Sequence, residues 1–340
     1  MTLSFDCHRI RLGNTAFEGL NNCYVLGTEP DAELTLVDTG IGHPETLAEL
    51  RAALAEVDAT FADVDRVLLT HWHGDHAGLA GEIQAAAGCP VHVHEADAPL
   101  VERPSAGHAD ALLREHVTDW GMPDEKQAEL FDFLAGADEW PAPTVTPFAA
   151  GDTFDIGPVT LEAVHLPGHT AGLSGFAFDG TAGRELFAGD ALLPYYTPNV
   201  GGADVRVDAP LSKYLDTLAG IVRDGYVRAW PGHRGAIVDP PGRAADIIAH
   251  HRKRTARVVD VLDDGPASPW VVSAVLFGDL QNIHILHGPG EAFAHLDHLH
   301  DAGLVERSGR EYALRSENPD IGPLFPDLQA YLPAGYEPVA

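Results

Sequence analysis

The segment THWHGDH, residues 70–76, holds three histidines and one aspartate directly after an apolar run. Adjacent side chains that follow a buried strand can converge on one point in space. His71 and His73 can together hold one metal ion, and Asp75 and His76 can turn toward a second ion. Imidazole nitrogen and carboxylate oxygen suit Zn²⁺, and also Fe or Mn. The spacing therefore predicts a metal site at the end of a strand.

One loop offers too few ligands for two ions, so further ligands must come from other strand ends. Three later segments each place one ligand-type residue beside glycine after a predicted strand: Pro167-Gly168-His169-Thr170, Gly189-Asp190 and Pro231-Gly232-His233. Glycine permits sharp turns and close approach of the backbone. A chance histidine-rich turn does not explain separate glycine-flanked ligands, so the four segments together predict one metal centre.

The elements that must position these residues alternate between strand and helix patterns. Strand patterns occupy 4–11, 23–26, 34–37, 67–69, 91–93, 159–164, 175–178, 185–187 and 226–230. Helical patterns occupy 44–57, 79–87 and 210–222, and the segment 96–140 is predicted to be mostly helical, where it can cover an active-site cleft. Such alternation, with hairpins mixed in, predicts a layered α/β sandwich.

The C-terminal quarter follows a different pattern. A long helix predicted over 243–262 ends at the stop signal DDGP, which divides the chain into two predicted domains, 1–262 and 263–340. Two shorter helices are predicted at 268–277 and 290–301, and a hairpin at 304–314. Two helices followed by a hairpin predict a small winged-helix-like α+β module.

Composition excludes several classes of protein. The chain has 340 residues and no apolar run near the ~20 residues that a membrane helix needs. We expect no secretory signal, because the N-terminus lacks a charged start followed by an apolar stretch. Cys7, Cys23 and Cys89 are widely spaced and odd in number, which predicts no disulfide framework and a reducing cytoplasm.

The charge balance is strongly acidic. Fifty-one acidic residues face 21 basic residues, for a formal net charge of −30. Two explanations stay open: adaptation to a salty cytoplasm, where screening removes the self-repulsion, and an ordinary acidic protein from a GC-rich genome. Either explanation disfavours general nucleic-acid binding, because phosphate contacts require a basic surface.

The set HWHGDH, PGH, GD and PGH resembles the metallo-β-lactamase superfamily over roughly residues 4–235. This resemblance implies a four-layer αβ/βα sandwich with the site at one edge of two packed sheets. It implies two zinc ions per chain, with Fe or Mn as alternatives. The implied ligands are His71, His73 and His169 for the first ion, Asp75, His76 and His233 for the second, and Asp190 as the bridge. Asp38 in LVDTG and Thr170 in PGHT are expected to support the metal loops.

The expected chemistry is hydrolysis. Two cations a few ångströms apart hold a water between them and lower its pKa from 15.7 toward ~7. The resulting hydroxide attacks a carbonyl or phosphoryl centre, and the metals stabilise the developing oxyanion. Asp75 and Asp190 are the expected catalytic residues: Asp75 accepts or orients the water's proton, and Asp190 sets the metal separation.

Departures from other branches of the family narrow the substrate. The commonest zinc β-lactamases carry Cys at the position of Asp190, which disfavours antibiotic hydrolysis. The segment 191–232 is too short for the large insert of the nucleic-acid-processing nucleases. The persulfide dioxygenases of this fold use one iron, whereas the complete ligand set of this chain favours a hydrolase with two metals.

The segments GDALLPYYTPNVGG, PLSKYL, HHRKR and AHLDHLHDAGLVER resemble a bacterial and archaeal subgroup with a C-terminal winged helix. That subgroup has a eukaryotic endoribonuclease relative and fungal acyl-carrier-protein thioesterase relatives. Our leading hypothesis is an ester, thioester or lactone hydrolase acting on a small acyl substrate, and the alternative is a single-strand endoribonuclease. A nucleic-acid-binding regulator is disfavoured, because the candidate recognition helix 291–301 has no Arg or Lys. The module is instead expected to pack beside the active site or to form a homodimer contact.

Five residues are candidate substrate contacts. Trp72, Tyr195 and Tyr196 are apolar enough to line a pocket beside the metals. Arg252 and Arg254 lie in HHRKRTAR, a dense basic run that can receive an anionic group such as a phosphate or a CoA moiety. If that run does not bind substrate, it is a solvated helix end.

Overall fold

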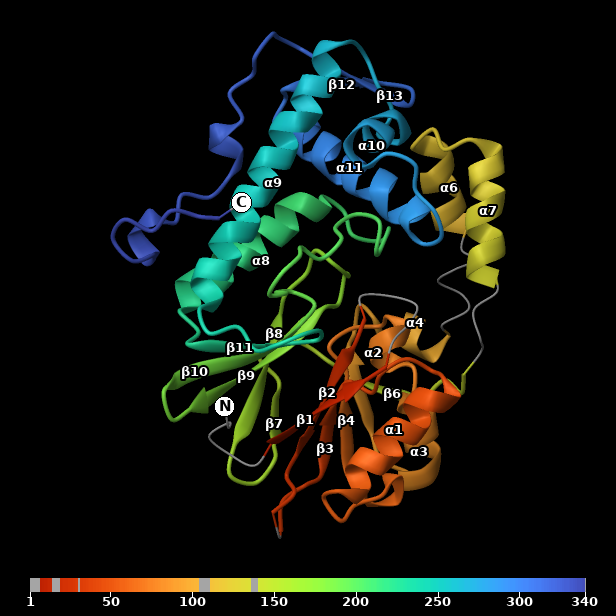
Figure 1. Ribbon diagram of the computed structural model, residues 1–340, viewed down its shortest axis with the longest axis vertical. Helices are drawn as coiled ribbons and strands as arrows, with labels where there is room; N and C mark the ends of the chain where they lie inside the picture. Colours follow the sequence, from red (N-terminus) through yellow and green to blue (C-terminus); the bar gives the residue numbers. More distant parts are fainter. Residues whose placement is uncertain (1–6, 14–18, 30, 104–110, 136–139, 340) are drawn as a thin grey trace.

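The computed structural model describes residues 7–13, 19–29, 31–103, 111–135 and 140–339. Two β-sheets pack face to face, with helices on both outer sides (Figure 1). This arrangement confirms the predicted α/β sandwich. The helices that the structure describes include none with the length and apolarity that crossing a bilayer requires.

The first sheet has the order β1-β2-β3-β4-β5-β6, with antiparallel pairing from β1 to β3 and parallel pairing from β3 to β6. Its strands are β1 (Cys7–Leu12), β2 (Asn21–Leu26), β3 (Thr35–Val37), β4 (Arg66–Leu68), β5 (Val91–His94) and β6 (Val145–Phe148). The sequence pattern did not predict β6. The strand predicted over residues 4–11 corresponds to β1, and its first residues lie outside the described part of the chain. The outer face packs on α1 (Pro44–Ala55), α3 (Ala80–Ala87) and α4 (Ala98–Glu102) through residues such as Leu50, Leu54 and Ile83.

The second sheet has the order β11-β10-β9-β8-β7. Its strands are β7 (Thr153–Asp155), β8 (Thr160–His165), β9 (Ser174–Gly180), β10 (Gly183–Gly189) and β11 (Arg228–Pro231). The outer face packs on α8 (Pro210–Asp224) and α9 (Pro240–Asp263). Aromatic side chains fill the space between the sheets, among them Tyr24, Phe176, Phe187 and Trp230. Because both sheets are anchored on this core, their strand ends meet along one edge.

The C-terminal part continues from α9 into α10 (Pro269–Phe277), α11 (His284–Asp301) and the antiparallel hairpin β12 (Val305–Ser308) and β13 (Glu311–Leu314). Val258, Leu262, Val272 and Leu299 share one small core. Helix α11 begins six residues before the predicted start at 290 and contains Pro289. Glycine and proline make HGPG a poor helical segment by itself, and its packing against neighbouring chain segments holds it helical.

The predicted helical segment 96–140 forms α4, α6 (Ala111–Asp119) and α7 (Asp124–Ala135), with two stretches outside the described residues. Trp120 follows α6 and is buried against Phe293 of α11, and its carbonyl accepts a hydrogen bond from Trp270 N of α10 (2.9 Å). In Figure 1, α6 and α7 lie beside α10 and α11. These two helices therefore pack onto the C-terminal part, and Trp120 does not line a pocket beside the metal ligands.

Candidate metal centre

The predicted ligands lie where four strands end. His71 and His73 follow β4, and His169 follows β8, while Asp190 and His233 follow β10 and β11. The remaining two ligands lie on a short helix, α2 (Gly74–Ala77), rather than in a loop. The strand ends converge at the shared edge of the two sheets, and they bring together ligands that are up to 162 positions apart in the chain, His71 and His233.

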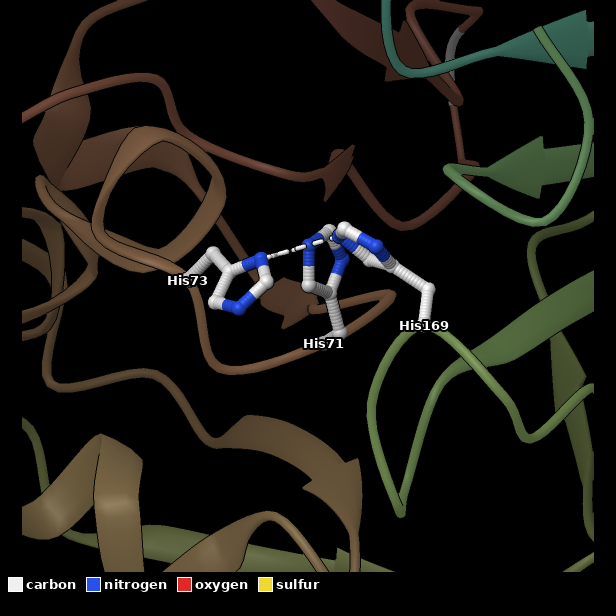
Figure 2. Close-up of side chains that lie close together, drawn as sticks. All are labelled: His71, His73 and His169. Carbon is white, nitrogen blue, oxygen red and sulfur yellow. Dashed lines mark hydrogen bonds between the residues drawn. The ribbon is translucent and has the colours of Figure 1, made fainter. Parts of the chain in front are cut away.

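Three histidines form the first ligand group, which Figure 2 shows with their ring nitrogens turned toward one another. His73 Nδ1 lies 3.0 Å from His71 Nε2 and 3.1 Å from His169 Nε2. Ligand nitrogens of a tetrahedral zinc site with bonds of 2.0–2.1 Å stand about 3.3 Å apart. The three nitrogens are therefore spaced to share one cation.

The second ligand group adds two carboxylates. His233 Nε2 lies 3.5 Å from Asp75 Oδ2 and 3.4 Å from Asp190 Oδ2, and His76 Nε2 lies 3.8 Å and 3.6 Å from the same two carboxylates. Asp190 Oδ2 is also 3.9 Å from His169 Nε2 of the first group. Asp190 therefore contacts both groups, which is the position that a bridging ligand requires.

Unpaired buried atoms indicate that this centre suits cations. Within the described residues, His76 Nε2, Asp190 Oδ1 and His233 Nε2 are buried and have no hydrogen-bond partner. Buried polar atoms normally have a partner, so such a cluster requires an explanation. Nitrogen and carboxylate donors at these spacings fit a pair of divalent transition-metal ions.

Each ligand histidine has its outer ring nitrogen fixed by an oxygen. The partners are Thr70 Oγ1 for His71 (3.0 Å), Ala203 O for His73 (3.1 Å), Asp38 Oδ2 for His76 (2.8 Å), Asn199 O for His169 (2.8 Å) and Leu20 O for His233 (3.3 Å). A carbonyl or carboxylate can only accept, so the outer nitrogen carries a proton and the inner nitrogen is the one that can bind a metal ion. Partners of this kind orient metal-binding imidazoles.

Asp38 supports two ligands at once. Its carboxylate accepts hydrogen bonds from Thr70 N (2.8 Å), Thr70 Oγ1 (2.9 Å) and His76 Nδ1 (2.8 Å). Because the Thr70 hydroxyl donates to Asp38, its oxygen accepts from His71 Nδ1. Asp38 thus orients His76 directly and His71 through Thr70.

A second buried carboxylate, Asp97, joins the loops around the first ligand group, and sequence analysis missed it. Asp97 accepts from Thr170 Oγ1 (2.8 Å), Gly172 N (2.9 Å) and Arg206 Nη2 (2.8 Å). Burial and the nearby charge of Asp204 raise the pKa of Asp97, against the opposing charge of Arg206. Thr170 therefore supports the His169 loop through Asp97. No local motif marks Asp97, Asp204 or Arg206, because their role exists only after folding.

Burial and nearby charges shift the pKa values of the ligand histidines in opposite directions. Burial holds the pKa of His71 and His73 well below the usual range, which keeps these imidazoles neutral, as metal ligation requires. Burial alone would lower the pKa of His76, but the charges of Asp190, Asp75 and Asp38 raise it well above the usual range. The carboxylates of the centre therefore stabilise positive charge next to them, as a metal ion would supply.

Glycine is required beside two ligands for steric reasons. A Cβ atom on Gly232 would lie 2.4 Å from Asp190 Oδ1 and 2.5 Å from His76 Cε1. Gly189 has a φ of +49°, and a Cβ there would lie 2.7 Å from Thr70 Cβ. The glycines that flank the ligands in the sequence therefore make room for the metal centre itself.

The candidate substrate contacts have different surroundings. Trp72 is buried in the core of the first sheet, with its ring centre 4.6 Å from that of His73 and 6.0 Å from the Arg206 guanidinium. Arg254 is paired with Glu291, and Arg252 is exposed on α9 near Gly322. In the structure the Trp72 ring is used in packing and the Arg254 charge in an ion pair, and their contact with a substrate stays a prediction.

The two candidate tyrosines, Tyr195 and Tyr196, differ in their exposure to solvent. Tyr195 is 80% exposed and is accessible to a substrate at the surface. Tyr196 is half-buried, and its backbone carbonyl accepts a hydrogen bond from Arg243 Nη2 (2.9 Å). Of the three aromatic candidates, Tyr195 has the exposure that a substrate contact needs.

A separate cluster of buried imidazoles lies between α9 and α11. His251 Nδ1 is 3.4 Å from His295 Nε2, and His295 Nδ1 is 2.7 Å from Thr255 Oγ1. Burial lowers the pKa of both histidines well below the usual range, and burial with the charge of Arg254 lowers the pKa of the neighbouring His250 to about 4. These rings are neutral in the folded protein at neutral pH.

The metal-free protein is expected to lose stability as pH falls from about 6.5, the ordinary histidine pKa, toward about 4, the folded pKa of His250. The unfolded chain takes up protons first, so acid favours unfolding over this window. His250→Gln should make the decline of melting temperature with pH shallower, measured in chelator between pH 7 and 4. His300→Gln, which changes an exposed histidine near the end of α11, is the control. Equal slopes for wild type and His250→Gln would contradict this prediction.

Comparison with known proteins agrees with this geometry. The sequence of residues 16–233 matches the family model of the metallo-beta-lactamase superfamily. The lactamase-like protein aptB of Emericella nidulans is 27% identical over 250 residues, covering 73% of this chain and 62% of that protein. An atrochrysone carboxyl ACP thioesterase of the same organism is 27% identical over 254 residues, covering 74% and 63%. The matches thus span less than two thirds of these relatives.

Solved structures match nearly the whole chain. A metallo-beta-lactamase family protein from Thermus thermophilus superposes with a TM-score of 0.76 and 28% identity, covering 91% of this chain and 98% of that chain. The similarity therefore extends beyond residue 233 into the C-terminal helices.

Proposed function

Because the chain belongs to the metallo-β-lactamase superfamily, we propose that it is a binuclear metal-dependent hydrolase of an ester, thioester or lactone in a small acyl substrate. The observation that carries the proposal is the pair of adjacent ligand groups that share Asp190. His71, His73 and His169 would hold one ion, and Asp75, His76 and His233 the other, with Asp190 between them. Zinc suits these donors, and Fe and Mn are alternatives.

Two bound divalent cations would lower the pKa of a coordinated water and polarise a substrate carbonyl. Asp75 would accept or orient the proton of that water. Asn21 Nδ2 donates a hydrogen bond of 3.1 Å to Asp75 Oδ2 and so holds the carboxylate in place. His71, His76 and His233 are fully buried, whereas Asp75, Asp190 and His169 keep 5–7% exposure. His73 is half-buried and is therefore more exposed than these ligands, so substrate would approach from the side where His73, His169 and the two carboxylates lie.

Two observations favour an acyl substrate over RNA. Relatives at about a quarter identity include proteins named as acyl-carrier-protein thioesterases. Phosphodiester binding depends on cations along the backbone, but Arg254 is committed to Glu291 and Arg206 to Asp97 and Asp204, in a chain of net charge −30. A thioester of a small acyl group places no such demand on the protein.

We also propose that residues 1–262 form the hydrolase domain and residues 263–340 a winged-helix-like domain of a cytoplasmic protein. The order α10, α11, β12, β13 supports the second assignment. The start of α9 packs on the second sheet and its end packs into the small C-terminal core, so this helix would connect the two domains. Val271 and Val275 of α10 are exposed and are available for a homodimer contact.

The test is a substrate panel on zinc-loaded protein: acyl thioesters, aryl esters, lactones, phosphodiesters and single-stranded RNA. We expect measurable thioester or aryl-ester hydrolysis, and RNA cleavage slower by about 10²-fold or more, because few phosphate contacts are available. His71→Ala is the matched inactive control. Efficient metal-dependent RNA cleavage that survives repurification and disappears in His71→Ala would establish the endoribonuclease alternative instead.

A further inference from the structure

One short loop, residues 199–203, holds two of the three histidines of the first ligand group. His169 Nδ1 donates to the backbone carbonyl of Asn199 (2.8 Å), and His73 Nε2 donates to that of Ala203 (3.1 Å). We call this loop the strap. Since a histidine ligand is oriented through its outer nitrogen, the position of the strap sets where the inner nitrogens of both rings point.

The strap is seated on α11 of the C-terminal part. Asn199 Nδ2 donates to the carbonyl of His287 (3.0 Å) and to Glu291 Oε2 (3.2 Å), and Asn199 Oδ1 accepts from Gly202 N (3.1 Å). The backbones also touch: a Cβ on Gly201 would lie 2.4 Å from Gly290 O, at a φ of +87°. The strap has no space to shift toward α11.

Glu291 is in turn fixed from α9. Arg254 pairs with Glu291 Oε1, while Asn199 occupies Oε2. Both side chains are mostly buried, so neither is free to reorient toward water without losing its partner. Contacts therefore run without interruption from Arg254 through Glu291 and Asn199 to His169.

We infer that Asn199, Glu291 and Arg254 are positioning residues, through which the C-terminal helices set the geometry of the first metal group. The inference rests on the metal ligands proposed above, and it gives the C-terminal part a role in the centre itself. It also accounts for Arg254, which sequence analysis assigned to substrate binding.

The test is Asn199→Asp, in which the side chain keeps its shape and an acceptor for Gly202 N. The donor facing His287 O and Glu291 Oε2 becomes an acceptor, so the strap is repelled from α11. We expect zinc affinity at the first site to fall about 10-fold or more, within the range for residues that orient metal ligands, and the second site to change little. Competition with a chromophoric chelator measures both affinities without substrate, and the visible spectrum of the cobalt-loaded protein reports the first site's geometry.

Two further variants separate positioning from general destabilisation. Leu299→Ala lies in the small C-terminal core away from the strap and should lower the melting temperature without changing either zinc affinity. The double variant Asn199→Asp with Glu291→Gln exchanges amide and carboxylate, restores a donor between the two positions, and should recover part of the lost affinity. Failure of the wild type to bind two ions would contradict the proposed function. Two ions bound equally well by wild type and Asn199→Asp would overturn this inference alone.

Discussion

Asp190→Ala is expected to reduce hydrolysis by about 10²–10³-fold, the scale seen when one electrostatic contact to the transition state is removed. Asp190 lies 3.4 Å from His233 and 3.6 Å from His76 of the second group, and 3.9 Å from His169 of the first. Its loss should weaken metal binding and disturb the separation between the two ions.

The fold should survive this substitution. Asp190 follows the end of β10, and the sheets are held by aromatic packing between them, which Asp190 does not enter. Circular dichroism and melting temperature check the fold, elemental analysis checks the metal content, and turnover checks the chemistry. Asp208→Ala, an exposed carboxylate paired with Lys213, is the matched control and should keep full activity. Near-normal turnover of Asp190→Ala would show that the bridging assignment is wrong.

Metal removal is expected to have the second large effect. Dialysis against a strong chelator should bring hydrolysis to background and lower the melting temperature, and about two equivalents of zinc should restore both. A metal ion that binds only the folded chain stabilises the fold by about 4 kcal/mol when its free concentration is 1,000 times the dissociation constant. The effect should be large here because the buried atoms His76 Nε2 and His233 Nε2 have no hydrogen-bond partner among the described residues.

The matched control for metal removal is His71→Ala, which lacks one ligand of the first group. It should bind fewer ions than the wild type and gain less stability from zinc. A wild-type protein that holds no more than one iron, and that oxidises a sulfur substrate with oxygen, would belong to the dioxygenase class instead.

The sequence by itself predicted the layered α/β sandwich and the segments that carry the ligands. Both follow from local rules: apolar periodicity distinguishes helices from strands, and a ligand beside glycine at a strand end is visible without any fold. The predicted ligands His71, His169, Asp190 and His233 come from separate segments, and the structure brings all four together.

Elements whose conformation depends on distant packing were less predictable. The helix α11 runs through Pro289 because Gly290 packs against the backbone of Gly202. Strand β6 completes the first sheet by pairing in parallel with β5, although the predicted helical segment runs close to its start. In both places the local signal was weak or pointed to another structure, and tertiary contacts decided the outcome.

Only the tertiary structure decided what the remaining charged and aromatic residues do. Trp72 stands between two ligands in the chain, and its side chain packs in the core with its ring against that of His73. Asp97 carries no local motif, and the basic run around Arg254 predicted a substrate contact instead. The observed roles of Asp97 and Arg254 arise from Glu291, Thr170 and Arg206, which lie 37 to 109 positions away. The physical reason is that a ligand motif is a property of short segments, whereas the support of each ligand depends on which distant groups share its buried, low-dielectric surroundings.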